Sequence, residues 1–461
     1  MPNDLMKRNI GPLDKRKNTT RCQPCATRRI KCEGGRPCER CVRTKKPCVP
    51  QLSEQTQVKF VHVSGHVLSS SIPVPVRRHD NAIYLDHFAS FIQRCHFSKD
   101  FAATNADIVT VIGRNPLLLN IAIAIGALDA GRKGSIRSFG KLEAPQKIAF
   151  RACGKSIQDL YSALSTTGSV FKEDVFWSTF LHGLFELLAE YSGNSFANHM
   201  VFGASKMLLL LEPTSRLSVP TKSLINAFCV LEANRAILYG NNTVLPRIWQ
   251  CGLTRESWPE PMNKILMLMS ASMIRFANYA YHLRLFETIE SVPLELRSLD
   301  SGLDALAQEG LKIKERLRNC QEESNWERLP ADCFAQLASV VHCAILLYHC
   351  RNFTFYSCWM TRAVPQLNRI EVDKHVSTIL KLSQSILSDT DIPAVLLLFP
   401  LRMAGVHVFD NHAQERVLSI LCKIRQKGFV VSDRIELDLQ EFWHYAQGQL
   451  NKSLYPYSSD L

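Results

Sequence analysis

The sequence predicts a mainly α-helical protein with a small cysteine-rich head, a flexible linker and a large all-α domain. Six of the 16 cysteines lie between positions 22 and 48. Prolines and serines with little periodicity follow, and from about residue 81 onward apolar side chains recur at helical spacing, with almost no strand-like alternation. We therefore expect four segments, which are a basic arm over 1–21, the head over 22–48, the linker over 49–80 and the helical domain over 81–461.

The length and composition are those of a globular protein with an appendage. The chain has 461 residues, of which 46% are hydrophobic and 21% charged. The best membrane-span candidate, 392–409, is interrupted by Pro393, Pro400 and Arg402, and the N-terminus lacks a secretory signal pattern. We expect no membrane span and a reducing compartment, where cysteines serve as thiols or metal ligands.

Positive charge is concentrated in the head and the arm. Residues 1–50 hold 14 Lys and Arg but only four Asp and Glu, whereas the remainder of the chain is nearly neutral. This excess predicts a polyanion-binding segment. A basic tail that only increases solubility is the alternative.

The cysteine spacing favours a metal cluster. The pattern is C-x2-C-x6-C-x5-C-x2-C-x6-C, two near copies with three cysteines each. Each C-x2-C turn can present two thiolates to one zinc ion, but tetrahedral zinc needs four ligands. Two thiolates that bridge both metals would supply the missing ligands, and a segment this short needs metal to fold. The expected ligands are Cys22, Cys25, Cys32, Cys38, Cys41 and Cys48.

These cysteines, the basic run 28–31 and Pro37 between the two halves resemble the fungal binuclear zinc-cluster DNA-binding domain. The resemblance implies two zinc ions bridged by Cys22 and Cys38. One zinc would then bind Cys22, Cys25, Cys32 and Cys38, and the other would bind Cys38, Cys41, Cys48 and Cys22.

The resemblance also implies how double-stranded DNA is recognised. A short helix starting near Cys25 would enter the major groove at a CGG-type triplet, with Arg28 and Arg29 facing the bases. Arg29 stands where the family usually has Lys, and Ala26 stands where Arg is frequent, which puts one phosphate contact in doubt. The expected phosphate contacts are Lys31, Lys45 and Lys46.

The basic arm contains two short clusters separated by a spacer. They are Lys7 with Arg8, and Lys15 with Arg16 and Lys17. A bipartite nuclear import signal is one interpretation, which places the protein in the nucleus. Additional electrostatic attraction for DNA is the other.

The linker shows no sustained heptad pattern. Two alternatives stay open, which are binding as a monomer and formation of a homodimer through the helical domain.

The helical domain is predicted from apolar periodicity. Asn115 followed by Pro116 is typical of a helix start, and the Trp177, Phe180 and Leu184 stripe indicates another helix. Further helical runs are expected at 144–166, 196–211, 222–239, 261–289, 299–319, 331–351, 372–388, 393–407, 413–428 and 434–449.

This domain resembles the fungal-specific transcription-factor regulatory domain. The similarity rests on the run 180–188 with His199, Gly203 and Ala204, and on Phe399-Pro400-Leu401 with Ala404 and Gly405. Phe196 stands where a Trp is common. The resemblance implies an α-helical regulatory domain.

Two other groups of residues invite a chemical interpretation. His342-Cys343 and His349-Cys350 could form a second metal site, but their apolar surroundings favour buried core residues. Glu186 and His199 could form an acid/base pair, but no nucleophile or phosphate-binding loop accompanies them, so we expect a packing role for His199 and no enzyme activity.

The sequence thus predicts a nuclear, zinc-dependent, sequence-specific DNA-binding transcription factor that recognises CGG-type triplets and regulates RNA polymerase II genes. Co-regulators or the transcription machinery are the expected protein partners. The resemblance favours control of a biosynthetic, secondary-metabolite gene cluster. The alternative is a zinc-based protein-interaction module, or a repressor or co-regulator, that does not contact bases directly.

Overall fold

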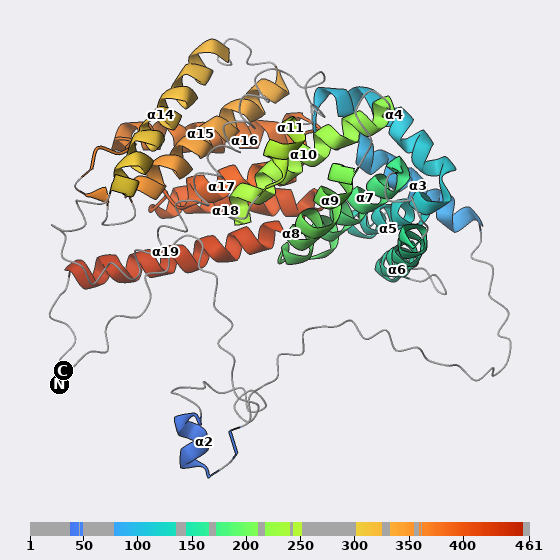
Figure 1. The fold of residues 1–461 in the computed structure, drawn as a ribbon, viewed down its shortest axis with the longest axis horizontal. Helices are drawn as coiled ribbons and strands as arrows, with labels where there is room; N and C mark the ends of the chain where they lie inside the picture. Colours follow the sequence, from blue (N-terminus) through green and yellow to red (C-terminus); the bar gives the residue numbers. More distant parts are fainter. Residues whose placement is uncertain are drawn as a thin grey trace. The chain divides into compact units, whose positions relative to one another are not determined.

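The structure, a computed structural model, describes residues 37–45, 47–48, 78–134, 144–165, 172–210, 217–239, 243–250, 301–324, 332–354, 359–360 and 362–454. Every regular element in these ranges is a helix, and none is a strand (Figure 1). The chain divides into two units, Met1–Pro75 and Val76–Leu461. The mainly α fold class is confirmed.

The first unit contributes one described helix, α2 (Glu39–Arg43). The helices of the second unit are α3 (Arg78–Gln93), α4 (Lys99–Arg114), α5 (Pro116–Lys133), α6 (Pro145–Leu164), α7 (Glu173–Ala189), α8 (Asn194–His199), the π-helix η2 (Met200–Ala204), α9 (Ser205–Leu210), α10 (Val219–Tyr239), α11 (Leu245–Gln250), α14 (Ser301–Ser324), α15 (Cys333–Thr354), α16 (Arg369–Asp389), the 3₁₀-helix η6 (Ala394–Leu397), α17 (Leu398–Gly405), α18 (Asn411–Gln426) and α19 (Ser432–Leu454).

Side-chain caps fix where several of these helices begin. The Asn115 side chain accepts a hydrogen bond from the Leu117 amide at 2.9 Å, and Pro116 occupies the first turn of α5. Asn368 forms a capping box with Glu371 at the start of α16. The predicted start of α5 is confirmed, because both the capping side chain and the proline lie where the sequence placed them.

Helix α5 is the centre of the N-terminal half of the second unit. It packs against α3, α4, α6 and α7, and its interior turns are buried on nearly all sides. Gly126 lets α3 come close, because a Cβ at this position would lie 1.8 Å from the Tyr84 carbonyl oxygen. Any other residue at position 126 would force α3 to move away from α5.

Helix α15 has the corresponding role in the C-terminal half. It packs against α14, α16 and α17, and α19 runs along α17 and α18 (Figure 1). One continuous apolar core extends from Tyr84 in α3 to Trp443 in α19, so the two halves share it.

By length and composition the best candidate for a membrane span is α15, and not the segment 392–409 considered from the sequence. By length and composition this helix could span a bilayer, with a mean hydropathy of 1.6 over its best window, and 83% of that window is buried inside the structure. A core helix meets the same criterion. Helices α4 and α5 meet it only if they are taken together across a bend of 114°.

The single helix predicted over 196–211 is interrupted. Residues Met200–Ala204 form a π-helical turn between α8 and α9. The spacing of apolar residues does not predict such a turn. The π-helical turn takes up one or two extra residues, and the flanking helices keep the same buried face. The run predicted over 261–289 lies outside the described residues.

Candidate metal centre

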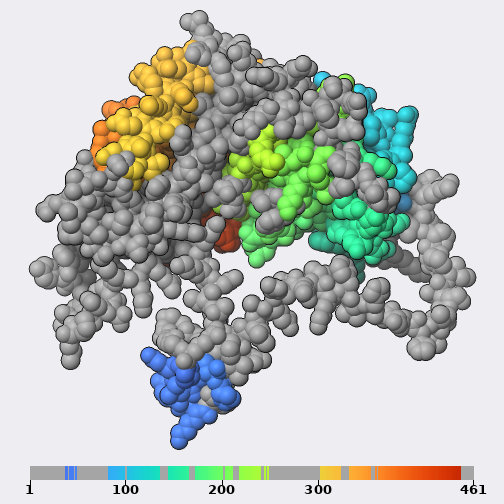
Figure 2. Space-filling model, in the orientation of Figure 1, coloured from blue at the N-terminus to red at the C-terminus, as the bar shows by residue number. Residues whose placement is uncertain are grey.

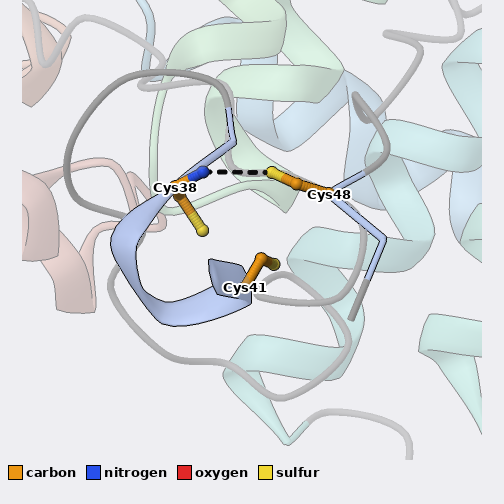
Figure 3. A group of neighbouring side chains, drawn as sticks. All are labelled: Cys38, Cys41 and Cys48. Carbon is orange, nitrogen blue, oxygen red and sulfur yellow. Dashed lines mark hydrogen bonds between the residues drawn. The ribbon is translucent and has the colours of Figure 1, made fainter. Parts of the chain in front are cut away.

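Three cysteines of the second half of the head are brought together. The sulfur atoms of Cys38, Cys41 and Cys48 all lie within 4.8 Å of one another and point toward a common centre (Figure 3). Cys38 immediately precedes α2 and Cys41 lies inside it, so their three-residue spacing puts both sulfurs on one side of the turn. A hydrogen bond of 3.1 Å from the Val42 amide to the Cys38 carbonyl oxygen closes that turn.

The chain reverses after α2 and brings the third cysteine back. Lys45 has a φ of 49°, in the left-handed region, and its amide donates to the Val42 carbonyl oxygen at 3.1 Å. The Cys38 amide then donates to the Cys48 sulfur at 3.3 Å. This bond holds the Cys48 sulfur beside the start of α2.

This arrangement fits a zinc site. Zinc–sulfur bonds of about 2.3 Å in a tetrahedron place sulfurs about 3.8 Å apart, which agrees with three sulfurs gathered within 4.8 Å. Cys38 and Cys41 are buried and Cys48 is half-buried. Over the part of the chain that the structure describes, no other group of His, Cys, Asp and Glu meets the same test for a metal ion.

The remaining predicted residues of the head are placed as follows. Lys45 is exposed at the end of the α2 turn, beside exposed Arg43 and Thr44. The others lie outside the described residues, which are Cys22, Cys25, Cys32, Arg28, Arg29, Lys31, Lys46, Lys7, Arg8, Lys15, Arg16 and Lys17.

A second polar cluster lies in the helical domain between α7 and the π-helical turn. His199 Nε2 donates to the Thr179 carbonyl oxygen at 2.6 Å, and His199 Nδ1 lies 3.8 Å from a Glu186 carboxylate oxygen. His182 Nδ1 donates to the Ser178 carbonyl oxygen at 2.7 Å. The His182 bond lies within α7, whereas the His199 bond joins α8 to α7, which supports the packing role expected for His199.

Burial controls the ionisation of this cluster. Removal from water lowers the pKa of His182 to about 4 and also lowers the pKa of His199. The same effect, with a smaller contribution from the charge of Glu190, raises the pKa of Glu186 to about 7. Both histidines are therefore neutral at neutral pH.

The histidines of α15 are used for packing as well. His342 Nε2 donates to the Leu317 carbonyl oxygen and His349 Nε2 donates to the Gly310 carbonyl oxygen, each at 2.8 Å. Both acceptors belong to α14, so the two histidines join α15 to that helix. Their burial agrees with the predicted core role.

Two features of the helical domain were not predicted from the sequence. One is an ion pair between Glu232 and Arg235 within α10, with both side chains buried and an Nε–Oε2 distance of 2.7 Å. The other is an exposed apolar row on α6, whose seven- and four-residue spacings are visible in the sequence once the helix boundaries are known.

Comparisons with known proteins agree with this architecture. The description "Fungal specific transcription factor domain" matches residues 83–453, and "Fungal Zn(2)-Cys(6) binuclear cluster domain" matches residues 20–57. No curated protein and no solved structure matches the chain. Neither matching family is an enzyme family, and the cluster domain binds two zinc ions. The chain therefore belongs to the fungal zinc-cluster transcription factors. Its DNA-binding cluster domain precedes a helical domain that makes up most of the chain.

Proposed function

We propose that this transcription factor recognises CGG-type triplets in nuclear DNA and regulates RNA polymerase II genes. The observation that supports the proposal best is the convergence of the Cys38, Cys41 and Cys48 sulfurs within 4.8 Å. These three cysteines have the same internal spacing as Cys22, Cys25 and Cys32. A matching arrangement in the first half would complete two metal sites.

In the proposed cluster, the six cysteines would hold two zinc ions, with Cys22 and Cys38 shared between them. Cys25 and Cys32 would complete the ligands of one ion, and Cys41 and Cys48 those of the other. The hydrogen bond from the Cys38 amide to the Cys48 sulfur keeps these two cysteines of the second half together. Zinc in this position holds the fold and carries charge, and the bases and phosphates are contacted by protein side chains.

The repeat also suggests how basic residues are used. Lys45 follows Cys41 at the same distance as Arg29 follows Cys25. We assign base contacts to Arg28 and Arg29, and phosphate contacts to Lys45 with Lys31 and Lys46. Lys45 is exposed where the chain leaves the α2 turn, which suits a phosphate contact.

The remaining parts of the proposal concern location and partners. We assign nuclear import to the arm residues Lys7, Arg8, Lys15, Arg16 and Lys17, and we place no segment in a membrane, because α15 is mostly buried. Co-regulators are proposed as protein partners, and a secondary-metabolite gene cluster as the target. Mapping of bound genomic sites, together with transcript changes in a deletion strain, tests the target and separates activation from repression.

Fluorescence anisotropy with the full chain tests the DNA contacts. A duplex that contains a CGG triplet is compared with duplexes altered at each base, with and without a zinc chelator. We expect binding of the CGG duplex that the chelator abolishes, and a loss of about 1–3 kcal/mol together with weaker discrimination for Arg29→Ala. Binding that ignores both the triplet and the chelator would instead favour a protein-interaction module without base recognition.

Lys45→Asn tests a phosphate contact without disturbing the backbone. Asn tolerates the left-handed conformation of Lys45, so the substitution removes the charge and keeps the turn. We expect all duplexes to bind more weakly by a similar factor, and the slope of log affinity against log salt to fall by about one. An unchanged slope would exclude the contact.

A further inference from the structure

A cavity of about 360 Å³ lies where four helices of the second unit meet. Its described lining comes from the end of α4, the start of α5, the start of α7 and the residue before α10, and these helices pack against one another. Figure 2 shows atoms of the N-terminal helices (cyan) and of α10 (green) at the surface of this unit. Small-molecule sites range from about 300 to 1,000 Å³, so the cavity suits a small metabolite.

Part of the lining is apolar and held in place. Leu118 and Trp177 line the cavity and are buried, and Val111 lines it with 39% of its surface exposed. The Trp177 indole N–H donates to Thr221 Oγ1 at 2.7 Å, which fixes the ring. An apolar ligand body can therefore pack here without ordering a mobile side chain.

One of the two carboxylates in the lining is already engaged. Glu173 accepts a hydrogen bond from the Ser218 amide at 3.0 Å and further bonds from the hydroxyls of Ser218 and Thr221. These bonds hold the start of α10 against the start of α7. Glu173 thus shapes the cavity, and its acceptors are occupied by the protein.

The other carboxylate, that of Asp174, has an acceptor without a donor. Its Oδ2 accepts a long hydrogen bond of 3.4 Å from the Asn115 amide, whereas its Oδ1 is shielded from solvent and has no hydrogen-bond partner. A shielded carboxylate oxygen without a donor is unfavourable. Because rotation about the Cβ–Cγ bond of Asp is soft, a donor in the cavity that Asp174 lines can satisfy this oxygen.

We propose that this cavity binds a small organic ammonium ion with an apolar body. The ammonium group donates to Asp174, and the apolar body packs against Leu118 and Trp177. A carboxylate and an indole ring are the two groups that best recognise an organic cation, the first by a charge-assisted hydrogen bond and the second through its π system. The site does not involve the head, so its test and the DNA assay fail or succeed independently.

Other ligands fit less well. The described lining holds two carboxylates and one ammonium group, that of Lys172, so an anion would meet net negative charge. A metal ion needs several closely gathered ligands, and among the described residues only the cysteines of the head form such a group. A zwitterion would place its carboxylate beside Lys172, and the experiment separates this case from a simple amine.

The test uses isothermal titration calorimetry with the full chain and three ligands of similar shape. They are 2-phenylethylamine, which is a cation at pH 7, the neutral 2-phenylethanol and the anionic 3-phenylpropionate. Isoamylamine serves as a second amine that lacks the ring. We expect saturable binding of the amines with one site per chain, and at least about tenfold weaker binding of the alcohol and the acid.

Substitutions locate the site. Asp174→Asn keeps an acceptor for the Asn115 amide but removes the charge, so 2-phenylethylamine should bind at least about tenfold more weakly and should no longer raise the melting temperature. Val111→Trp fills part of the cavity and should weaken binding as well. Glu415→Gln, at an exposed acid of α18, is the matched control for loss of one negative charge and should change nothing.

Lys172→Gln gives a result of defined sign. It removes a positive charge from the lining, so an amine should bind more tightly, and the gain should shrink as salt is added. Far-UV circular dichroism and thermal unfolding verify that each variant is folded.

Several results would overturn the proposal. No saturable binding of either amine up to about 10 mM excludes an ammonium site. Equal binding by the wild type and Asp174→Asn excludes the carboxylate, and unchanged binding by Val111→Trp places the amine elsewhere. Tighter binding of 3-phenylpropionate would make the cavity an anion site. Binding of L-phenylalanine that exceeds that of the amine, and that Lys172→Gln weakens, would make the ligand a zwitterion.

Discussion

Asp129 shows how a single buried carboxylate joins two helices. It accepts hydrogen bonds from His87 at 3.1 Å, Arg94 at 3.0 Å and Lys133 at 2.8 Å. Burial by itself would raise the pKa of Asp129, but these bonds together hold it below its usual value. His87 belongs to α3 and Arg94 directly follows its last residue, so the charge of Asp129 attaches the end of α3 to α5.

We predict that Asp129→Asn lowers the free energy of unfolding by about 2 kcal/mol, because charge-assisted bonds are lost and basic groups are left without their shared acceptor. Urea unfolding followed by circular dichroism measures the change. Since the folded-state pKa is lowered, the stabilisation is present above the ordinary Asp pKa and is lost as the pH falls below it. Asp107→Asn, an exposed acid on α4, is the control, and equal effects of the two substitutions would contradict the prediction.

Gly126 is the second residue on which the α3–α5 contact depends. In an ordinary helix interior, Gly→Ala stabilises by up to about 1 kcal/mol. Here we predict that Gly126→Ala destabilises by about 3 kcal/mol, because its Cβ would overlap the Tyr84 carbonyl group. Gly154→Ala on α6 is the matched control, since a Cβ there meets nothing, and it should raise the unfolding midpoint. The same sign for both variants would refute the packing argument.

At the scale of elements, periodicity predicted most helices of the domain but not how their polar groups meet. The start of α5 follows from Asn115 and Pro116 because capping is a local interaction. By contrast, the Arg402 guanidinium donates to the Leu238 carbonyl oxygen across 164 residues of sequence. Such a contact depends on the packing of α17 against α10, which a single sequence does not specify.

In the head, too, the sequence predicted some features of the structure and not others. The cysteine spacing alone predicted that Cys38, Cys41 and Cys48 share a site, because two of them lie in one turn. The start of α2 at Glu39, within the C-x2-C motif rather than after it, was not expected. Neither was the left-handed conformation of Lys45, since lysine has no particular preference for it.

We predict that Cys41→Ser reduces the zinc content below two ions per chain and abolishes DNA binding, because α2 then has one sulfur fewer to hold the metal. Elemental analysis and far-UV circular dichroism measure the metal and the helix content. The helical domain should keep its thermal transition. Cys422→Ser, an exposed cysteine of α18, should leave the zinc content unchanged, and loss of zinc in that variant would show that the head is not the metal site.

For the whole molecule, buried histidines determine the response to acid. Burial lowers the pKa of six histidines in the described part of the helical domain, and three of them fall to about 4. They are His182, His199, His342, His349, His375 and His407. Unfolding exposes them to water, where they take up protons near pH 6.5.

We therefore predict that the helical domain loses stability as the pH falls from about 7.5 to about 5.5, by about 1 kcal/mol for His182 alone. The sign follows because the unfolded chain binds more protons over this interval. Glu186 acts in the opposite direction, since its pKa of about 7 favours the folded state at lower pH, but it is one group against six. Urea midpoints across this range test the prediction, and a midpoint that is constant or rises on acidification would contradict it.

The apolar character of α15 has a consequence for how the protein is made. In the finished domain α14, α16 and α17 enclose this helix. On the ribosome, α15 emerges before α16 and α17 have been synthesised, so its most apolar side is temporarily without its covering. The nascent chain then exposes an apolar segment of the kind that chaperones bind. The exposure lasts until α16 and α17 have been synthesised and have packed against α15.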